Sequence, residues 1–193
     1  MTSTSKTRLN KIFCIIGPSG TGKNTLAREI PLPEVVSYRT RDIRDGEVDG
    51  KDGHFITKEE FIKMRTMGMW IAETDYAGNF YGITQGELLE LEDKPMTYVI
   101  DWDGVETLRE SITKIEGYSP EQIVTIFLHT PREDLKMRMM IRGTDKETIK
   151  ARLDRADRDY ASSSKCDYVV ENANGQLDKA ALDIMKIIMK ESF

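Results

Sequence analysis

The sequence predicts an α/β fold built around a parallel sheet. Short apolar runs of strand-like composition recur along the chain, and stretches of helical periodicity separate them. The apolar runs lack strict alternation of apolar and polar residues, which suits strands that are covered on both faces. Parallel strands need crossover connections, so we expect helices above and below the sheet in a three-layer core.

The strands of this core are expected at residues 12–16, 97–100, 123–128 and 168–170. Its helices are expected near residues 22–30, 103–115, 131–141, 145–163 and 175–190. Thr130 and Glu133, with Pro131 between them, form a capping-box pattern at the start of one of these helices. Right-handed crossovers would place a ligand at the carboxyl ends of the strands.

Residues 35–84 interrupt this alternation and predict a small mixed β lobe inserted into the core. Thr57 and Glu60 form a second capping-box pattern, which opens a helix through about Met67. Two runs of aromatic and β-branched residues flank a hairpin-like turn at residues 77–78. The lobe is where we expect a second substrate to bind.

A glycine-rich loop, GPSGTGK at residues 17–23, follows the first predicted strand. Its glycines let the backbone turn so that successive N–H groups converge, and the helix that follows adds its dipole. Lys23 supplies a mobile positive charge for β- and γ-phosphates. The spacing matches G-x-x-x-x-G-K-[ST] except that Asn24 holds the last position. The loop therefore predicts a nucleoside triphosphate site formed by Gly17, Pro18, Ser19, Gly20, Thr21, Gly22, Lys23, Asn24 and Thr25.

Arginines form two further clusters. Arg41 and Arg44 lie three apart in an irregular segment and could fork onto one phosphate dianion, unless they only pair with neighbouring carboxylates in a solvated loop. Arg138 and Arg142 share a helix face, and Gly143 separates that helix from the one carrying Arg152. Such a flap, about residues 138–160, could close over a transferring phosphoryl group, or it could be an exposed helix laced with ion pairs.

Asp101 and Asp103 follow the predicted strand at residues 97–100. A carboxylate at the end of a buried strand beside a phosphate loop is a usual place for a water-mediated magnesium contact. Either aspartate would suffice for the metal, and the other could face the acceptor. We assign the metal to Asp101, together with Asn24 and Thr25, and the acceptor to Asp103.

Composition limits the classes of function. The chain has 193 residues, 39% of them hydrophobic, and a net charge of −5, which argues against non-specific nucleic-acid binding. It contains two cysteines, too few for a disulfide framework. It shows neither a leader-like apolar stretch nor a run of membrane-spanning length, so we expect a cytoplasmic monomer or homodimer without nucleic-acid or membrane partners.

With these motifs in order, the chain resembles the guanylate kinase family from about residue 11 to 188. The resemblance rests on GPSGTGK, SYRTR with its following arginine and GE, DGKDGHF, GNFYG at 78–82, the two aspartates, RG at 142–143 and DYVVEN at 167–172. It implies a core (11–34 and 95–190) that binds ATP and Mg²⁺, a lobe (35–84) that binds a nucleoside monophosphate, and a lid. It also implies roles for single residues. Ser37, Arg41, Arg44 and Tyr81 would hold the acceptor phosphate, Lys23, Arg138, Arg142 and Arg152 would neutralise the phosphates in transfer, and Asn172 would touch adenine.

Four positions depart from the family pattern. Asn24 replaces a small hydroxyl residue, and Gly53 replaces a tyrosine that helps hold the acceptor phosphate. Ala72 occupies the place of a glutamate that reads guanine, with Glu73 next to it, and Ile83 replaces a hydroxyl residue on the O6 side. We carry Glu73 and Ile83 as acceptor residues. A one-residue shift along a strand turns a side chain to the other face unless a bulge restores it.

The sequence therefore predicts a kinase that transfers the γ-phosphoryl group of ATP to a nucleoside or deoxynucleoside 5′-monophosphate. GMP or dGMP is the acceptor that the resemblance implies. The altered base pocket favours a deoxypyrimidine or modified-base monophosphate as the alternative, such as dTMP or dUMP. A kinase for a phosphorylated sugar, a non-catalytic guanylate-kinase-like binding module and a nucleic-acid-end kinase are the remaining alternatives.

Overall fold

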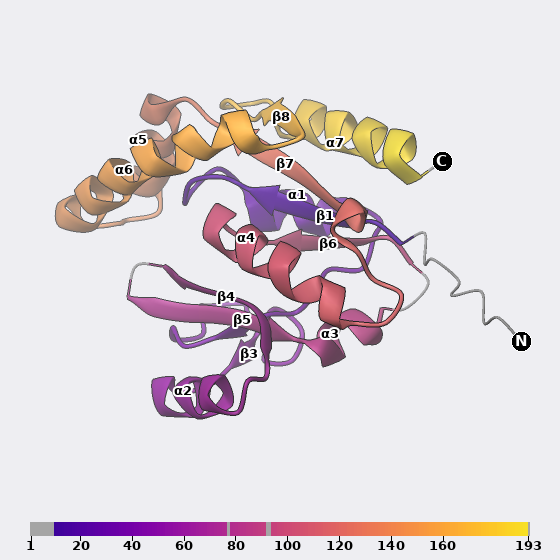
Figure 1. Ribbon diagram of the computed structural model, residues 1–193. Coiled ribbons are helices and arrows are strands. Elements are labelled where there is room, and N and C mark those ends of the chain that lie inside the picture. The colour runs from indigo at the N-terminus through magenta and orange to yellow at the C-terminus, as the bar shows by residue number, and fades with distance from the viewer. Residues whose placement is uncertain (1–9, 77, 92–93, 193) are drawn as a thin grey trace, which may run out of the picture.

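The computed structural model describes residues 10–76, 78–91 and 94–192. Its main sheet has four parallel strands in the order β6-β1-β7-β8 (Figure 1). The strands are β1 (Ile12–Ile16), β6 (Met96–Val99), β7 (Ile123–His129) and β8 (Tyr168–Glu171). Each coincides with a predicted strand to within a residue at either end, and the predicted α/β class is confirmed.

Alternate residues of β1 face different helices, which makes three layers. Phe13 and Ile15 pack with α1 (Lys23–Glu29) and α7 (Leu177–Ser192) on one face. Ile12, Cys14 and Ile16 pack on the other face with α4 (Trp102–Ser111), which two short 3₁₀ turns follow, η1 (Ile112–Lys114) and η2 (Pro120–Gln122). All five residues of β1 are buried, so the strand is anchored where the glycine-rich loop leaves it.

The second sheet is mixed and has the order β3-β2-β5-β4. It contains β2 (Tyr38–Arg39), β3 (His54–Phe55), β4 (Trp70–Tyr76) and β5 (Asn79–Thr84). The predicted turn falls between β4 and β5, and residue 77 in it lies outside the described residues. The helices of the lobe are α2 (Lys58–Thr66), with the predicted Thr57–Glu60 capping box, and a short α3 (Gln85–Leu89) that the sequence did not indicate. Ala72 and Ile83 join the core cluster around α4, so the lobe is packed against the main domain.

The lid comprises α5 (Arg132–Ile141) and α6 (Lys146–Ala161), followed by a 3₁₀ turn, η3 (Ser162–Lys165). These helices extend past the carboxyl ends of the strands (Figure 1) and share a small apolar cluster that includes Leu135, Met139 and Leu153. The capping box predicted at Thr130 is wrong. Pro131 caps α5 without a side-chain bond, and the Thr130 hydroxyl donates instead to the Asn172 carbonyl at 2.9 Å. None of the described helices is long and apolar enough to cross a membrane.

Candidate active site

Two adjoining clefts open at the carboxyl edge of the main sheet. The phosphate cleft lies along the glycine-rich loop and reaches Arg142 and Arg152 of the lid. The acceptor cleft lies between the loop and the small lobe, and its walls include Ser37, Arg39, Arg41, Thr74, Tyr81 and Asp101. Four residues line both clefts, namely Ser19, Lys23, Asn24 and Arg44. A group held in one cleft can therefore reach a group held in the other past Lys23 and Arg44.

Two glycines of the loop are required by close contacts. A Cβ on Gly17 would meet the Leu128 carbonyl oxygen at 2.6 Å, and a Cβ on Gly22 would meet Asn172 Nδ2 at 2.9 Å. Both glycines have positive φ, 144° and 92°, which other residues rarely adopt. The loop thus lies directly on the ends of β7 and β8. The sequence motif predicts that the backbone of this loop binds phosphate.

Lys23 Nζ is folded back onto the loop. It donates to the carbonyl oxygens of Gly17 at 2.5 Å and Pro18 at 2.8 Å. Burial lowers the pKa of Lys23 to about 8, although the carboxylates of Asp159 and Asp101 act in the opposite direction. Neutral carbonyls satisfy the ammonium without cancelling its charge, so an anion in either cleft would be attracted to it.

Arg41 and Arg44 are organised by Glu47. The Arg41 guanidinium binds both carboxylate oxygens of Glu47, at 2.7 and 2.6 Å, and the Arg44 backbone N–H donates to the same carboxylate at 2.9 Å. Burial alone would raise the pKa of Glu47, but these hydrogen bonds and the charges of both arginines lower it to about 2. The pairing that we considered for a solvated loop therefore exists, yet both arginines also line the acceptor cleft. Glu47 fixes the arginines at that position.

A row of residues crosses the small sheet beneath the acceptor cleft. Arg39 lies opposite Tyr81, and Tyr81 lies opposite Thr74. The Thr74 hydroxyl donates to Asp101 Oδ2 at 2.8 Å, so the row ends at the core. Arg39 and Thr74 were not among the predicted site residues. Their signal in the sequence was alternation, because Arg39 precedes Arg41 by two residues and Ser37 precedes Arg39 by two.

Asp101 is the N-cap of α4 as well as part of the cleft wall. Its Oδ1 accepts from the Gly104 backbone N–H at 2.9 Å, and Arg155 approaches Oδ2 to 3.7 Å. Burial raises the pKa of this carboxyl group. Both oxygens thus have protein partners, and the described residues contain no cluster of three metal-ligating acidic, histidine or cysteine side chains. This donor set fits a magnesium ion that is held mainly by phosphates and water better than an ion in a protein cage, and the parts of Asn24 and Thr25 stay predictions.

The three predicted lid arginines do not share one environment. Arg142 is exposed and Arg152 is partly buried, and both line the phosphate cleft. Arg138 instead binds backbone oxygens behind the loop, donating to Asn172 at 2.8 Å and to Thr21 at 3.3 Å. The helix-face argument placed Arg138 beside Arg142, but the guanidinium shares the Asn172 and Thr21 carbonyl oxygens at the back of the loop with other donors. In this structure Arg138 supports the loop.

Asn172 was expected to touch adenine, and the structure places it elsewhere. The side chain is 1% exposed, and Nδ2 donates to the Thr21 carbonyl at 2.7 Å. A side chain buried against the loop has no surface to offer a base. The motif identified a residue that joins β8 to the loop.

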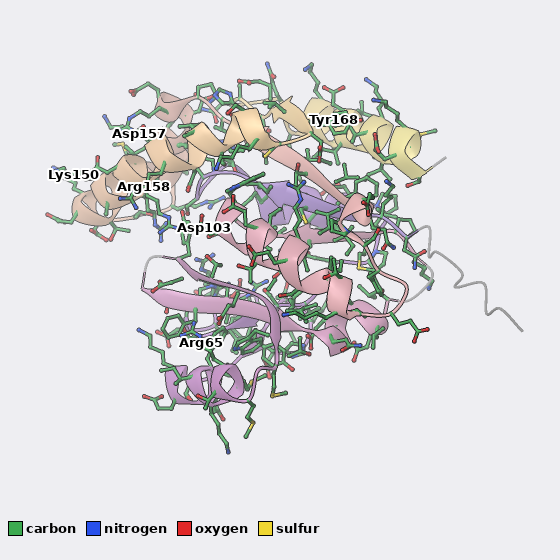
Figure 2. The ribbon with its side chains drawn as sticks, viewed as in Figure 1. Arg65, Asp103, Lys150, Asp157, Arg158 and Tyr168 are labelled. Carbon is green, nitrogen blue, oxygen red and sulfur yellow. The ribbon has the colours of Figure 1, made fainter. Side chains whose placement is uncertain are left out.

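The predicted base-reading residues lie outside the acceptor cleft. Glu73 pairs with Arg65 Nε at 2.7 Å, and Figure 2 shows Arg65 between the small sheet and α2, on the side away from the core. A register irregularity does occur between Trp70 and Ala72, but it does not turn Glu73 inward, because Thr74 and Tyr76 are the residues of β4 that line the cleft. Ala72 and Ile83 are both 0% exposed in the core. The positions that were predicted to read the base therefore bring neither a carboxylate nor a hydroxyl group into the acceptor cleft.

Asp103 also lies apart from the acceptor cleft. It is exposed in the first turn of α4, and Figure 2 shows it between α6 and the β4–β5 hairpin. It lines a separate groove together with Asp75, Arg155 and Arg158. The turn that follows Asp101 rotates Asp103 away, so only one of the two aspartates reaches the cleft.

Comparisons of the sequence and of the fold with known proteins match this chain to one family. The family model described as guanylate kinase matches residues 9–191. A guanylate kinase of Prochlorococcus marinus is 36% identical, over 94% of this chain and 98% of its own length. One of Nitratidesulfovibrio vulgaris is 34% identical, over 94% and 87%. Among solved structures, guanylate kinase from Anaplasma phagocytophilum superposes with a TM-score of 0.73 at 30% identity, over 95% of this chain and 87% of the other.

Proposed function

Since this chain belongs to the guanylate kinase family and is an ATP-dependent nucleoside monophosphate kinase, we propose that its acceptor is GMP or dGMP. The relatives at 36% and 34% identity carry the name guanylate kinase, and this supports the choice of base. The observation that carries the proposal is that the two clefts share Ser19, Lys23, Asn24 and Arg44. One phosphate chain and one acceptor phosphate would meet at these four residues.

The chain's residues can perform the transfer by positioning and charge. ATP supplies the phosphoryl group, and Mg²⁺ neutralises part of its charge. The backbone of the glycine-rich loop and Lys23 would hold the triphosphate, while Ser37, Arg41, Arg44 and Tyr81 would hold the acceptor phosphate. Arg142 and Arg152 of the lid would then offset charge on the group in transfer. Closure of the lid would also exclude water, which would otherwise hydrolyse ATP.

Lys23 gives ATP binding a specific pH dependence. Its pKa of about 8 in the ligand-free protein lies below the ordinary lysine value, and phosphates favour the charged form. Above pH 8 the lysine must therefore take up a proton when ATP binds. We expect the ATP affinity to be nearly constant around pH 7, to be about halved at pH 8, and then to fall by up to about tenfold per pH unit. Calorimetry in buffers of different ionisation enthalpy measures the proton uptake. A Lys23→Arg variant should show no such bend, and a flat wild-type profile up to pH 9.5 would contradict the assignment.

A pyrimidine monophosphate is the second candidate acceptor, because the residues that were expected to read guanine do not line the acceptor cleft. Ala72 and Ile83 are buried in the core, while Glu73 is held outside the cleft by Arg65. A site that lacks the carboxylate and the hydroxyl group at those positions loses two groups that would select guanine by hydrogen bonding. The same kinase would then accept dTMP or dUMP alongside GMP.

A panel of monophosphates measures how strongly the base is read. We expect kcat/KM for GMP, dGMP, dTMP and dUMP to lie within about 1000-fold of one another, as measured by ADP release with ATP saturating. Glu73→Ala should leave the order of preference unchanged, because that side chain faces Arg65 rather than the cleft. A GMP preference above about 1000-fold that Glu73→Ala removes would show that Glu73 turns inward on binding. A panel without any accepted nucleotide would overturn the proposed function itself.

A further inference from the structure

Arg39 is a buried arginine in the wall of the acceptor cleft, and neither the resemblance nor the mechanism above assigns it a role. It ends the short strand β2, and its residue is 6% exposed. Ser37 and Arg41 flank it at alternate positions, and Tyr81 lies directly opposite it on β5. All four line the acceptor cleft, so the Arg39 side chain lies within the group of residues assigned to the acceptor phosphate.

Gly53 provides the space that Arg39 occupies. A Cβ at position 53 would come within 2.8 Å of Arg39 Nε, 2.9 Å of Cδ and 3.1 Å of Cζ. Gly53 is not among the glycines with positive φ, so its backbone conformation does not require glycine. Position 53 therefore lacks a side chain because Arg39 fills the space that a Cβ would need.

The Arg39 guanidinium is only partly compensated by protein. Within the described part of the chain, its one side-chain hydrogen bond runs from Nε to Ser37 Oγ at 3.2 Å, and its nearest ion-pair partner is Glu47 at 3.9 Å. Both oxygens of Glu47 already accept from Arg41. Burial and the charge of Arg41 lower the pKa of Arg39, although the carboxylates of Glu34 and Glu47 act in the opposite direction. A guanidinium has five N–H donors, so most of its bonding capacity remains for a ligand.

From this geometry we propose that Arg39 is a third arginine of the acceptor-phosphate site, and that its terminal nitrogens bind the 5′-phosphate dianion together with Ser37 and Arg41. A buried cation without full compensation is costly, and a dianion placed beside it removes that cost. Planar guanidinium groups also match two phosphate oxygens at once. The inference rests on the proposed function, and it names a residue that selects acceptors by their phosphate rather than by their base.

Substitution of Arg39 tests this role directly. We expect Arg39→Ala to raise KM for the best monophosphate by about 10- to 100-fold, with KM for ATP unchanged. Calorimetry without ATP should show the same loss for the monophosphate. Arg39→Lys should restore part of the affinity because it keeps the charge but loses the fork. Arg65→Ala is the matched control, since Arg65 lies on the same lobe, pairs with Glu73 outside the cleft, and should not change acceptor KM.

Gly53 supplies a second test that remains informative if Arg39→Ala folds poorly. Gly53→Ala should displace the Arg39 side chain and weaken acceptor binding without affecting ATP. In the Arg39→Ala background the same change should have little further effect, because the space is then free, so the two substitutions should be strongly non-additive.

The outcomes separate the two proposals. If wild-type protein binds a monophosphate and Arg39→Ala binds it equally well, or if the Gly53 and Arg39 effects simply add, the role of Arg39 is overturned. If the wild-type protein binds none of the monophosphates, the proposed function fails instead.

Discussion

Lys23→Ala should lower kcat by about 10³-fold or more, because Lys23 is a cation that lines both clefts and belongs to the glycine-rich loop itself. Its ammonium rests on the Gly17 and Pro18 carbonyls in the ligand-free protein, within the loop that would hold the triphosphate. Removal of the charge leaves the transferring group without its main protein counter-charge. Steady-state ADP release with both substrates saturating measures the effect.

The matched control for this substitution is Lys11→Ala. Lys11 Nζ donates to the Glu121 carbonyl at 2.9 Å, in a groove shared with Lys190 and Glu191 that excludes the loop. This variant should keep wild-type kcat. Because burial already disfavours the charged form of Lys23 in the ligand-free protein, its removal should cost little stability. The melting temperature of Lys23→Ala should therefore lie within a few degrees of that of the wild type. A folded Lys23→Ala enzyme with near-normal kcat would remove Lys23 from the mechanism.

Arg142→Ala should lower kcat by about 10²- to 10³-fold with a smaller effect on acceptor KM. Arg142 ends α5, is exposed, and faces the phosphate cleft from the lid. An arginine that approaches the phosphates from a lid makes its strongest contact only when the lid is closed over the transferring group. Its loss should therefore appear in turnover more than in binding.

Lys136→Ala controls for loss of positive charge on the same helix, since Lys136 is an exposed residue of α5 outside the lining of the phosphate cleft. It should be neutral in both kcat and KM. Arg138→Ala offers a contrast, because the Arg138 side chain binds backbone oxygens behind the loop and its loss should destabilise the loop itself. If Arg142→Ala raised only KM for ATP and left kcat intact, Arg142 would be a binding residue rather than a group that acts in transfer.

The backbone of the fold was predictable because it depends on periodicity and on glycine. The strand at residues 12–16 and the loop after it follow from a buried apolar run and from turns that only glycine makes easily. The Thr57 capping box was equally local, since both of its hydrogen bonds join residues three apart. These features, which depend on neighbours in sequence, were predicted correctly, although the equally local capping box of Thr84 and Glu87 that opens α3 was missed.

Features that depend on contacts between distant segments were not predicted correctly. Thr130 has the pattern of a cap, but the Asn172 carbonyl, 42 residues away, is the acceptor that its hydroxyl uses. Asn172 and Arg138 sit at motif positions, yet both side chains bind the back of the loop rather than an open cleft. Spacing along the chain locates a residue but does not set its rotamer.

Glu73 and Arg39 show the same difference between local pattern and distant contacts, each within a single strand. Glu73 was predicted as an acceptor residue although alternation along β4 turns it to the other face, and in the structure Arg65 holds it outside the cleft. Arg39 was passed over because the sequence shows only one more charge in an arginine-rich segment. Its burial and the space left by Gly53 become visible only when β2 and β3 are paired.

A crystal structure with two nucleosides joined 5′ to 5′ by a chain of phosphates tests the central claim most directly. That claim is that two anionic nucleotides meet at Lys23 and Arg44, one along the glycine-rich loop and the other against the small lobe. The predicted result is one phosphate of the ligand bound by Ser37 and Arg41, with the remaining phosphates in the loop at residues 17–23. A ligand whose second half lies outside the acceptor cleft, away from Arg41 and Arg44, would contradict the claim.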